Sequence, residues 1–152
     1  MQRGTELQGE AAMLLMQSFE GYEVDRTLFA YHDSLKYVGA SFDLLLEKEG
    51  KYTHIEIKCP EDPLVHWKFL NMANASDLLA AEPKYFWQVI QEKQVINCDV
   101  VYFSSYHPDF EPGKQLTLLK IKHEDVTEYI DIWERRMQQA NSTILDFFNS
   151  KT

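Results

Sequence analysis

Three residues with the chemistry of a phosphodiester-cleaving site lie close together in the sequence. Asp43 is followed by a second acid, Glu56, and Lys58 comes two positions after Glu56. Two neighbouring carboxylates raise each other's pKa or hold a cation between them. Hard divalent cations such as Mg²⁺ bind carboxylate and carbonyl oxygens, and Ile57 supplies a backbone carbonyl at this point. The lysine can hold or deprotonate a water beside the ion, which is the chemistry of attack on a phosphodiester.

A β-hairpin is predicted to bring these residues together. Its first strand, turn and second strand are expected over residues 38–47, 48–51 and 52–58. With Glu49 and Gly50 at the centre of the turn, the pairing places Asp43 opposite Glu56. Opposed residues have Cβ atoms about 4.5–5.5 Å apart and share a face of the sheet. Because side chains alternate along a strand, Lys58 lies on the face of Glu56.

The other face of the hairpin is apolar. Ile55 and Ile57 point away from Glu56 and can pack into a core. Together with the leucines at 44–46 they indicate a hairpin in the middle of a sheet, where buried charge is costly unless it has a function. The alternative is a half-solvated hairpin with a Glu–Lys ladder, which composition alone favours.

The spacing of these residues resembles a known nuclease signature. Asp43 followed by E-I-K at 56–58 resembles the PD-(D/E)xK motif. More narrowly, S-F-D at 41–43 and E-I-K-C-P at 56–60 resemble S-P-D-G and E-L-K-C-P of the phage lambda-type exonuclease family, the YqaJ-like viral recombinases. The resemblance implies an α/β fold with a restriction-endonuclease-like PD-(D/E)xK core, a mixed β-sheet flanked by helices. It covers nearly all of the chain, so residues 1–152 are expected to form a single nuclease domain.

A second match lies downstream. Q-V-I at 88–90, followed by Y-H-P at 106–108, has the spacing of the family's Q-V-Q and Y-x-P. Gln88 is therefore the matched glutamine, expected to hydrogen-bond near the attacking water or the scissile phosphate. Ile90 departs from the family pattern. The alternative for Gln88 is an exposed helix glutamine.

The first helix carries another departure. Family members begin this helix with G-x-x-x-E, and the acid lies over the metal site. Here Gly4 is followed at that spacing by Gln8, an amide that can orient a water but adds no charge. Gln8 is expected to point inward, either as an accessory site residue or as a side chain satisfied by backbone partners.

The resemblance implies a Mg²⁺-dependent exodeoxyribonuclease, with Mn²⁺ as a substitute ion. It implies 5′-to-3′ digestion of double-stranded DNA in phage-type recombination, with metal held by Asp43, Glu56 and the Ile57 carbonyl. Lys58 would position and activate the water. Alternatives are an endonuclease or repair nuclease of the same superfamily, or a non-catalytic DNA-processing module on this fold.

The resemblance also suggests partners and a setting. A single-strand annealing protein, a homotrimer, and the cytoplasm of a bacterial or phage-infected host cell are expected. Family members carry an upstream arm whose Arg and Ser receive the 5′-phosphate. This sequence begins after that arm, so we expect a fragment or a reduced form.

Composition fits a globular protein but is unusual for one that binds DNA. The 152 residues are 45% hydrophobic and 26% charged, without an apolar run of the ~20 residues that a membrane span needs. Cys59 and Cys98 lack metal-binding spacing and are interpreted as reduced thiols. One interpretation of the net charge of −9 is a protein that never meets nucleic acid, because phosphate contacts come from Lys and Arg. We interpret the charge as evidence against tight, sequence-independent DNA binding by one subunit alone. A bound divalent cation would reverse the local sign, and basic residues can cluster in space, with these candidates: Lys58, Lys84, Lys93, Arg135 and Arg136.

The remaining pattern gives elements that would position the site. Helices are expected over residues 5–19, 84–93 and 123–149, and a short helix or an ordered loop over 64–70. A helix-tending segment is expected over 71–81, and strands over 22–31, 99–105 and 115–121. The apolar stripe of the last helix is expected to lie in the core. His54 shares the predicted face of Glu56 and is interpreted as a solvated strand histidine.

Overall fold

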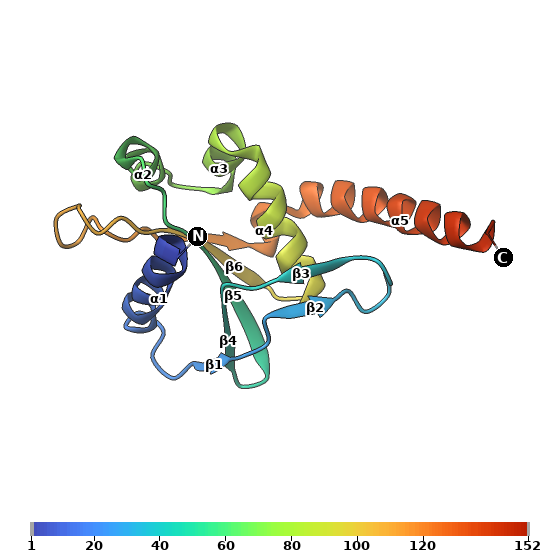
Figure 1. Ribbon diagram of the computed structural model, residues 1–152, viewed down its shortest axis with the longest axis horizontal. Helices are drawn as coiled ribbons and strands as arrows, with labels where there is room; N and C mark the ends of the chain where they lie inside the picture. Colours follow the sequence, from blue (N-terminus) through green and yellow to red (C-terminus); the bar gives the residue numbers. More distant parts are fainter. Residues whose placement is uncertain (1, 152) are drawn as a thin grey trace.

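The computed structural model describes residues 2–151 and places five strands in one mixed sheet, with helices on both faces (Figure 1). The strands lie in the order β1 (Glu23–Asp25), β4 (Leu44–Lys48), β5 (Lys51–Lys58), β6 (Val100–Ser105) and β7 (Leu119–Lys122). β5 and β6 pair in parallel, and the other neighbours pair antiparallel. The predicted α/β class with a mixed sheet flanked by helices is confirmed.

Each face of the sheet has its own apolar core. α1 (Gln2–Met16) covers one face, where its Ala11 and Leu15 pack with Ile55 and Ile57 of β5. On the other face lie α4 (Pro83–Val95) and α5 (Thr127–Asn149), with buried residues such as Phe86, Ile90, Val101 and Phe103. The alternation of β5 therefore directs its isoleucines toward α1 and leaves the intervening polar side chains facing α4.

Two short helices carry the chain from the end of β5 to α4. α2 (Pro63–Leu70) begins at Asp62, whose side chain accepts a hydrogen bond from the Leu64 N–H at 2.8 Å. α3 (Ala75–Ala81) begins with a capping box between Asn74 and Asp77. These caps fix the path by which α4 returns over the sheet, and Pro83 lies in the first turn of α4 as predicted.

The turn between β4 and β5 matches its prediction. Glu49 and Gly50 both have positive φ, 54° and 76°, as the central residues of a two-residue hairpin turn do. The register pairs Lys48 with Lys51 and Leu44 with Ile55. β5 is central in the sheet, with β4 on one side and β6 on the other. The buried position and the register are thus confirmed for residues 44–48 against 51–55, but the expected Asp43–Glu56 pair lies beyond the ladder, which ends at Leu44 and Ile55.

The first strand of that hairpin is not continuous. β3 (Gly39–Ser41) pairs with β2 (Phe29–Tyr31) in a separate two-stranded sheet, and pairing with β5 begins at Leu44. The Phe42 N–H still bonds toward the β2 side, to the Leu28 carbonyl at 3.0 Å, whereas the Asp43 N–H turns to His54. The predicted strand over 38–47 was wrong here, because the chain changes partner strand at residues 42–43.

Other boundaries differ for similar reasons. The strand expected over 22–31 divides into β1 and β2, because the Asp25 side chain accepts from the Thr27 N–H at 2.7 Å and turns the chain between them. The strand expected over 115–121 is shorter, since before β7 the pairing with the β6 side is an isolated bridge between Tyr106 and Leu116. The helix expected from 123 begins instead as a 3₁₀ turn, η1 (His123–Asp125), before α5. The helix expected over 5–19 ends at Met16.

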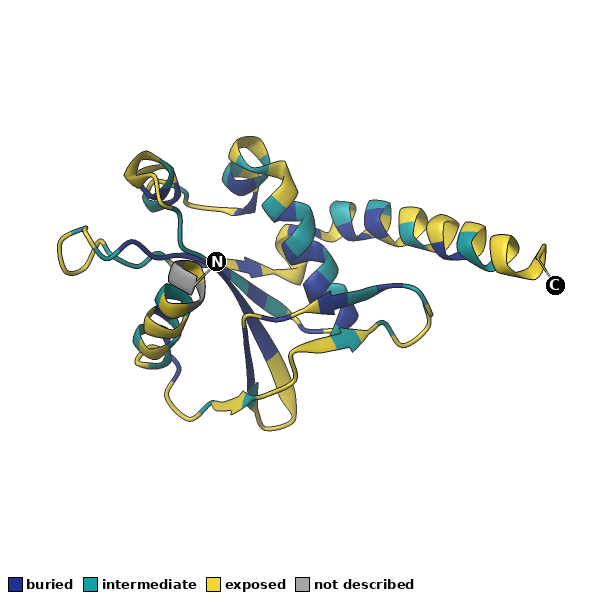
Figure 2. Cartoon of the chain, in the orientation of Figure 1, coloured by how far each residue is buried: buried dark blue, intermediate teal, exposed yellow. Residues whose placement is uncertain are grey.

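α5 leaves the body of the protein along its length (Figures 1 and 2). Ile130 and Trp133, near its start, are buried in the core. Near its end Phe147 and Phe148 are 53% and 54% exposed, although the Phe148 ring stacks on Tyr37. The apolar stripe is therefore core in its first part alone, and the prediction for its second part was wrong. Within residues 2–151, no helix combines the length and the apolar character that crossing a bilayer requires.

Candidate active site

Glu56 and Lys58, at the end of β5, meet the side chain of Gln88 from α4. The Gln88 amide donates to Glu56 Oε1 at 2.7 Å, and Lys58 Nζ donates both to Glu56 Oε1 and to Gln88 Oε1, the latter at 3.2 Å. Lys58 also lies 4.6 Å from the centre of the Tyr85 ring. Glu56 is buried and Lys58 is partly exposed, so the lysine lies between the interior and solvent. The structure thus places Gln88 beside the pair with which the sequence associated it.

Asp43 lies at the change of strand and reaches the same end of β5. Its Oδ2 accepts a hydrogen bond from the Ile57 N–H at 2.9 Å. The residue is exposed, and its charge is near enough to raise the pKa of Glu56. Asp43, Glu56, Ile57 and Lys58 therefore come together where β4 pairing stops.

Gln8 of α1 approaches this point from the other face of the sheet. Its side-chain amide donates to the Ile57 carbonyl at 3.3 Å. The β4 ladder ends at the pair Leu44–Ile55, so the backbone groups of Ile57 have no partner on β4. Instead, the Ile57 N–H donates to the Asp43 carboxylate, and the Ile57 carbonyl accepts from the Gln8 amide. The predicted inward orientation is confirmed. Its partner is a backbone group, and that group is also the carbonyl expected to bind metal.

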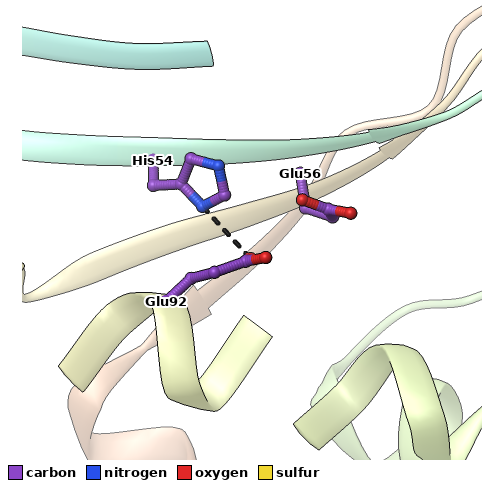
Figure 3. A group of neighbouring side chains, drawn as sticks. All are labelled: His54, Glu56 and Glu92. Atoms are coloured by element: carbon purple, nitrogen blue, oxygen red, sulfur yellow. Dashed lines mark ion pairs between the residues drawn. The ribbon is translucent and has the colours of Figure 1, made fainter. Parts of the chain in front are cut away.

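His54 and Glu92 extend the cluster into the interior (Figure 3). Their Nδ1 and Oε2 atoms are 3.3 Å apart, and their side chains are 0% and 3% exposed. Gln88 also donates to Glu92 Oε1 at 2.9 Å. The solvated histidine predicted at position 54 was wrong, because α4 and the Phe42 ring cover it. Glu92 was missed, although its position one helical turn after Gln88 signals a shared face.

Burial sets the protonation states of this cluster. It raises the pKa of Glu56 to about 8, and the charges of Glu92 and Asp43 act in the same direction. It also raises the pKa of Glu92 to about 8 and lowers that of His54 to about 4. Burial alone would lower the pKa of Lys58, but the charge and hydrogen bond of Glu56 outweigh it and raise that pKa. At neutral pH the imidazole is therefore neutral, the lysine is an ammonium, and the two glutamates retain protons unless a cation replaces them.

The donor set fits a divalent cation. Three carboxyl groups, those of Asp43, Glu56 and Glu92, lie near one ammonium, and ionising the two buried ones without a compensating cation is costly. The ligand atoms of His54, Glu56 and Glu92 lie within 4.8 Å of one another. Carboxylate and carbonyl oxygens are the ligands that Mg²⁺ prefers. Asp43, Glu56 and the Ile57 carbonyl supply such oxygens at the partly exposed end of the cluster.

A pocket opens beside these residues. Its volume is about 490 Å³, and it is lined by α4 and by the β2–β3 sheet. Gln88 and Glu92 form part of its wall, together with Ser41, Lys84 and Trp87. Solvent therefore reaches Gln88 from the side of α4, while His54, Glu56 and Glu92 remain buried behind it.

One of the basic residues expected at the surface is buried. Lys93 is 1% exposed, its Nζ donates to the Cys98 carbonyl, and it lies 3.3 Å from His123 Nδ1. It cannot contact DNA, so its predicted place in a basic surface cluster was wrong. Arg135 and Arg136 are exposed on α5, and Lys84 lines the pocket.

Solved structures of an exonuclease are similar in fold to this chain. A crystal structure of an alkaline exonuclease, LHK-Exo from Laribacter hongkongensis, is 21% identical to this chain and aligns with a TM-score of 0.67, covering 99% of this chain and 72% of that one. This chain has the fold of that exonuclease. A structure of LHK-Exo in complex with dAMP is 22% identical and aligns with a TM-score of 0.68 over the same shares of the two chains. No family model and no curated protein matches the sequence.

Proposed function

We propose that this protein is a metal-dependent deoxyribonuclease that digests double-stranded DNA from 5′ to 3′. The observation that carries the proposal is the convergence of Asp43, Glu56, Lys58 and Gln88 at one end of β5. The fold shared with an alkaline exonuclease supports the same activity. Mg²⁺ is the proposed ion, with Mn²⁺ as a substitute.

Asp43, Glu56 and the Ile57 carbonyl would hold the ion. When bound, a divalent cation supplies a Lewis acid that polarises the phosphate and stabilises the leaving oxygen. Gln8 and Asp43 fix the backbone of Ile57 from both sides, so its carbonyl oxygen keeps its direction. The chain would thus provide a rigid oxygen ligand between two acidic ones.

Lys58 and Gln88 would act on the water and the phosphate. Because Lys58 is an ammonium with Glu56 and Gln88 as acceptors, we assign it the role of orienting the attacking water and neutralising charge on the phosphate. The Gln88 amide would donate to a phosphate oxygen once Glu56 binds the ion. Gln88 lines the pocket and the Lys58 side chain is 23% exposed, so a DNA strand could reach both.

The proposed setting is phage-type recombination in the cytoplasm of a bacterial cell. There a single-strand annealing protein would receive the strand that the nuclease exposes. A homotrimer is the proposed assembly. These three points rest on the sequence resemblance.

Digestion of a linear duplex with 5′-phosphate ends tests the activity. We expect Mg²⁺-dependent release of nucleotides by the wild type, loss of at least a hundredfold in rate for Lys58→Ala, and no cutting of a closed circle. Equal rates for the two proteins would remove the role of Lys58. Cleavage of the circle would favour an endonuclease, and no digestion with either Mg²⁺ or Mn²⁺ would contradict the proposal.

A further inference from the structure

The two ring nitrogens of His54 face different parts of the site. Nε2 lies 3.3 Å from the backbone nitrogen of Asp43, an N–H that can act as a donor alone, so Nε2 is the acceptor. In a neutral imidazole the proton is then on the other nitrogen. The proton on Nδ1 therefore lies on the side of Glu92, whose Oε2 is 3.3 Å from Nδ1.

This second contact is closed to water. Among the described residues, His54 Nδ1 and Glu92 Oε2 are buried polar atoms without a hydrogen-bond partner, because their 3.3 Å contact with each other lacks hydrogen-bond geometry. A buried donor or acceptor left unpaired costs free energy. Pairing of the two atoms would satisfy both and would hold the ring between α4 and the chain at Asp43.

Asp43 needs such support because of its place in the fold. It lies between β3, which pairs with β2, and β4, whose ladder with β5 begins at Leu44. Its N–H bonds to His54, and its carboxylate accepts from the Ile57 N–H. These two contacts determine where the carboxylate lies at the end of β5.

We propose that His54 is a positioning residue that ties the buried carboxylate of Glu92 to the backbone N–H of Asp43 and so fixes Asp43 for metal binding. The metal in this statement rests on the proposed function. The bridge itself does not, because it is defined by the contacts of His54 with Glu92 and Asp43. Residues that orient a metal ligand typically contribute tenfold to a hundredfold in metal affinity.

A histidine-bound ion is the competing explanation. The ligand atoms of His54, Glu56 and Glu92 are close enough to surround a cation. An ion at Nδ1 would move the ring proton to Nε2, where it would face the Asp43 N–H, donor against donor. The hydrogen bond from the Asp43 N–H to Nε2 therefore favours the bridge.

Nitrogen NMR of the histidine rings tests the bridge without any nuclease assay. In the full chain, stripped of metal with EDTA, we expect the neutral His54 ring to carry its proton on Nδ1 and to keep it there when Mg²⁺ or Zn²⁺ is added. A proton on Nε2 would overturn the proposal. So would replacement of the Nδ1 proton by Zn²⁺.

Mn²⁺ affinity, measured by calorimetry, tests the positioning role. His54→Leu removes the acceptor for the Asp43 N–H and should weaken Mn²⁺ binding about tenfold or more. His54→Gln keeps a side-chain oxygen that can accept from that N–H and should restore most of the affinity. Melting temperatures in EDTA would be recorded for each variant, to separate this effect from lost stability.

His66 offers a matched control. Its ring is 0% exposed like that of His54, and its nitrogens lie 2.8 Å from Ser105 Oγ and 2.8 Å from the Lys114 carbonyl. His66→Leu should lower the melting temperature without changing Mn²⁺ affinity. Unaltered Mn²⁺ binding in His54→Leu would overturn the role of His54 alone. Absence of Mn²⁺ binding in the wild type would overturn both this role and the proposed function.

Discussion

Glu56 lies between two kinds of neighbour. Lys58 and Gln88 donate to it from the solvent side, while Glu92 and the neutral ring of His54 adjoin it in the interior. Donors favour its ionised form, and burial opposes that form more strongly. Without a cation, folding therefore holds protons on this cluster that the unfolded chain would release.

A pH dependence of stability follows at the residue scale. The folded pKa values of Glu56 and Glu92, about 8, are raised from 4.5, so their stabilising contribution is complete below pH 4.5 and is lost as pH rises through 8. His54, lowered from 6.5 to about 4, acts in the opposite sense and loses its contribution as pH falls below 6.5. Between pH 6.5 and 8 the carboxylates dominate.

We therefore expect the free energy of unfolding in EDTA to fall across that interval, by about 1.4 kcal/mol per pH unit for each proton released. Thermal unfolding at several pH values measures the slope. Glu92→Gln removes one titrating group and should flatten it, and saturating Mg²⁺ should do the same in the wild type. A stability that is constant or rises over this interval would contradict the assignment.

The sequence predicted that Asp43, Glu56 and Lys58 lie close together, but it did not predict the buried residues behind them. Asp43, Glu56 and Lys58 could be found because turn and alternation are local properties of one hairpin. Whether His54 is solvated or buried depends on α4, which folds back over β5 from a distant part of the chain. No local pattern shows whether a helix covers this residue, so a polar residue on a polar face is predicted to be solvated.

The same limit applies to whole elements. The β4–β5 hairpin is specified by Glu49 and Gly50, which adopt the positive φ that its turn requires. The pairing of β3 with β2 depends instead on which strand meets residues 39–41 in space. The alternation of polar and apolar residues in this segment does not identify its partner strand. The break at residues 42–43 results from the pairing of β3 with β2.

Gly39 tests the importance of this small sheet. A Cβ at this position would lie 2.5 Å from Cζ of Phe29 and 2.9 Å from the backbone oxygen of Ala30. Because a strand carbonyl cannot swing aside, Gly39→Ala should destabilise the protein by about 1–3 kcal/mol. Displacement of the neighbouring Asp43 should also weaken Mn²⁺ binding. Denaturant unfolding and calorimetry measure the two effects.

Gly9 is the control for that substitution. It lies within α1, and a Cβ there would have no atom within 4 Å. Gly9→Ala should be neutral or stabilising by up to about 1 kcal/mol, since alanine favours a helix interior. Equal stability of the two variants would show that the β2–β3 sheet is not closely packed at Gly39.

At the scale of the whole molecule, charge opposes the proposed substrate. The net charge is −9, and Lys93 is buried away from the surface. Affinity for DNA grows with the number of phosphates that a protein neutralises, so binding by this chain should be weak without a cation. We expect Ca²⁺ in place of Mg²⁺ to tighten binding of a labelled duplex at least tenfold over EDTA, measured by fluorescence anisotropy.

Two variants separate a site effect from a change in net charge. Asp43→Asn should lose most of the Ca²⁺ effect, because it removes a proposed ligand. Asp146→Asn, on the projecting end of α5, makes the same change in charge and should keep the effect. A Ca²⁺ effect that persists in Asp43→Asn would place the cation elsewhere on the protein.

The alternation of β5 has a consequence for how the gene can vary. Ile55 and Ile57 lie under α1, while His54 and Glu56 face α4. Loss of one codon in this strand would turn the isoleucines toward the glutamate of α4 and bury the charges beneath α1. Conservative exchanges such as isoleucine for valine leave that arrangement intact. Natural or laboratory variants of this segment should therefore carry substitutions but no insertions or deletions.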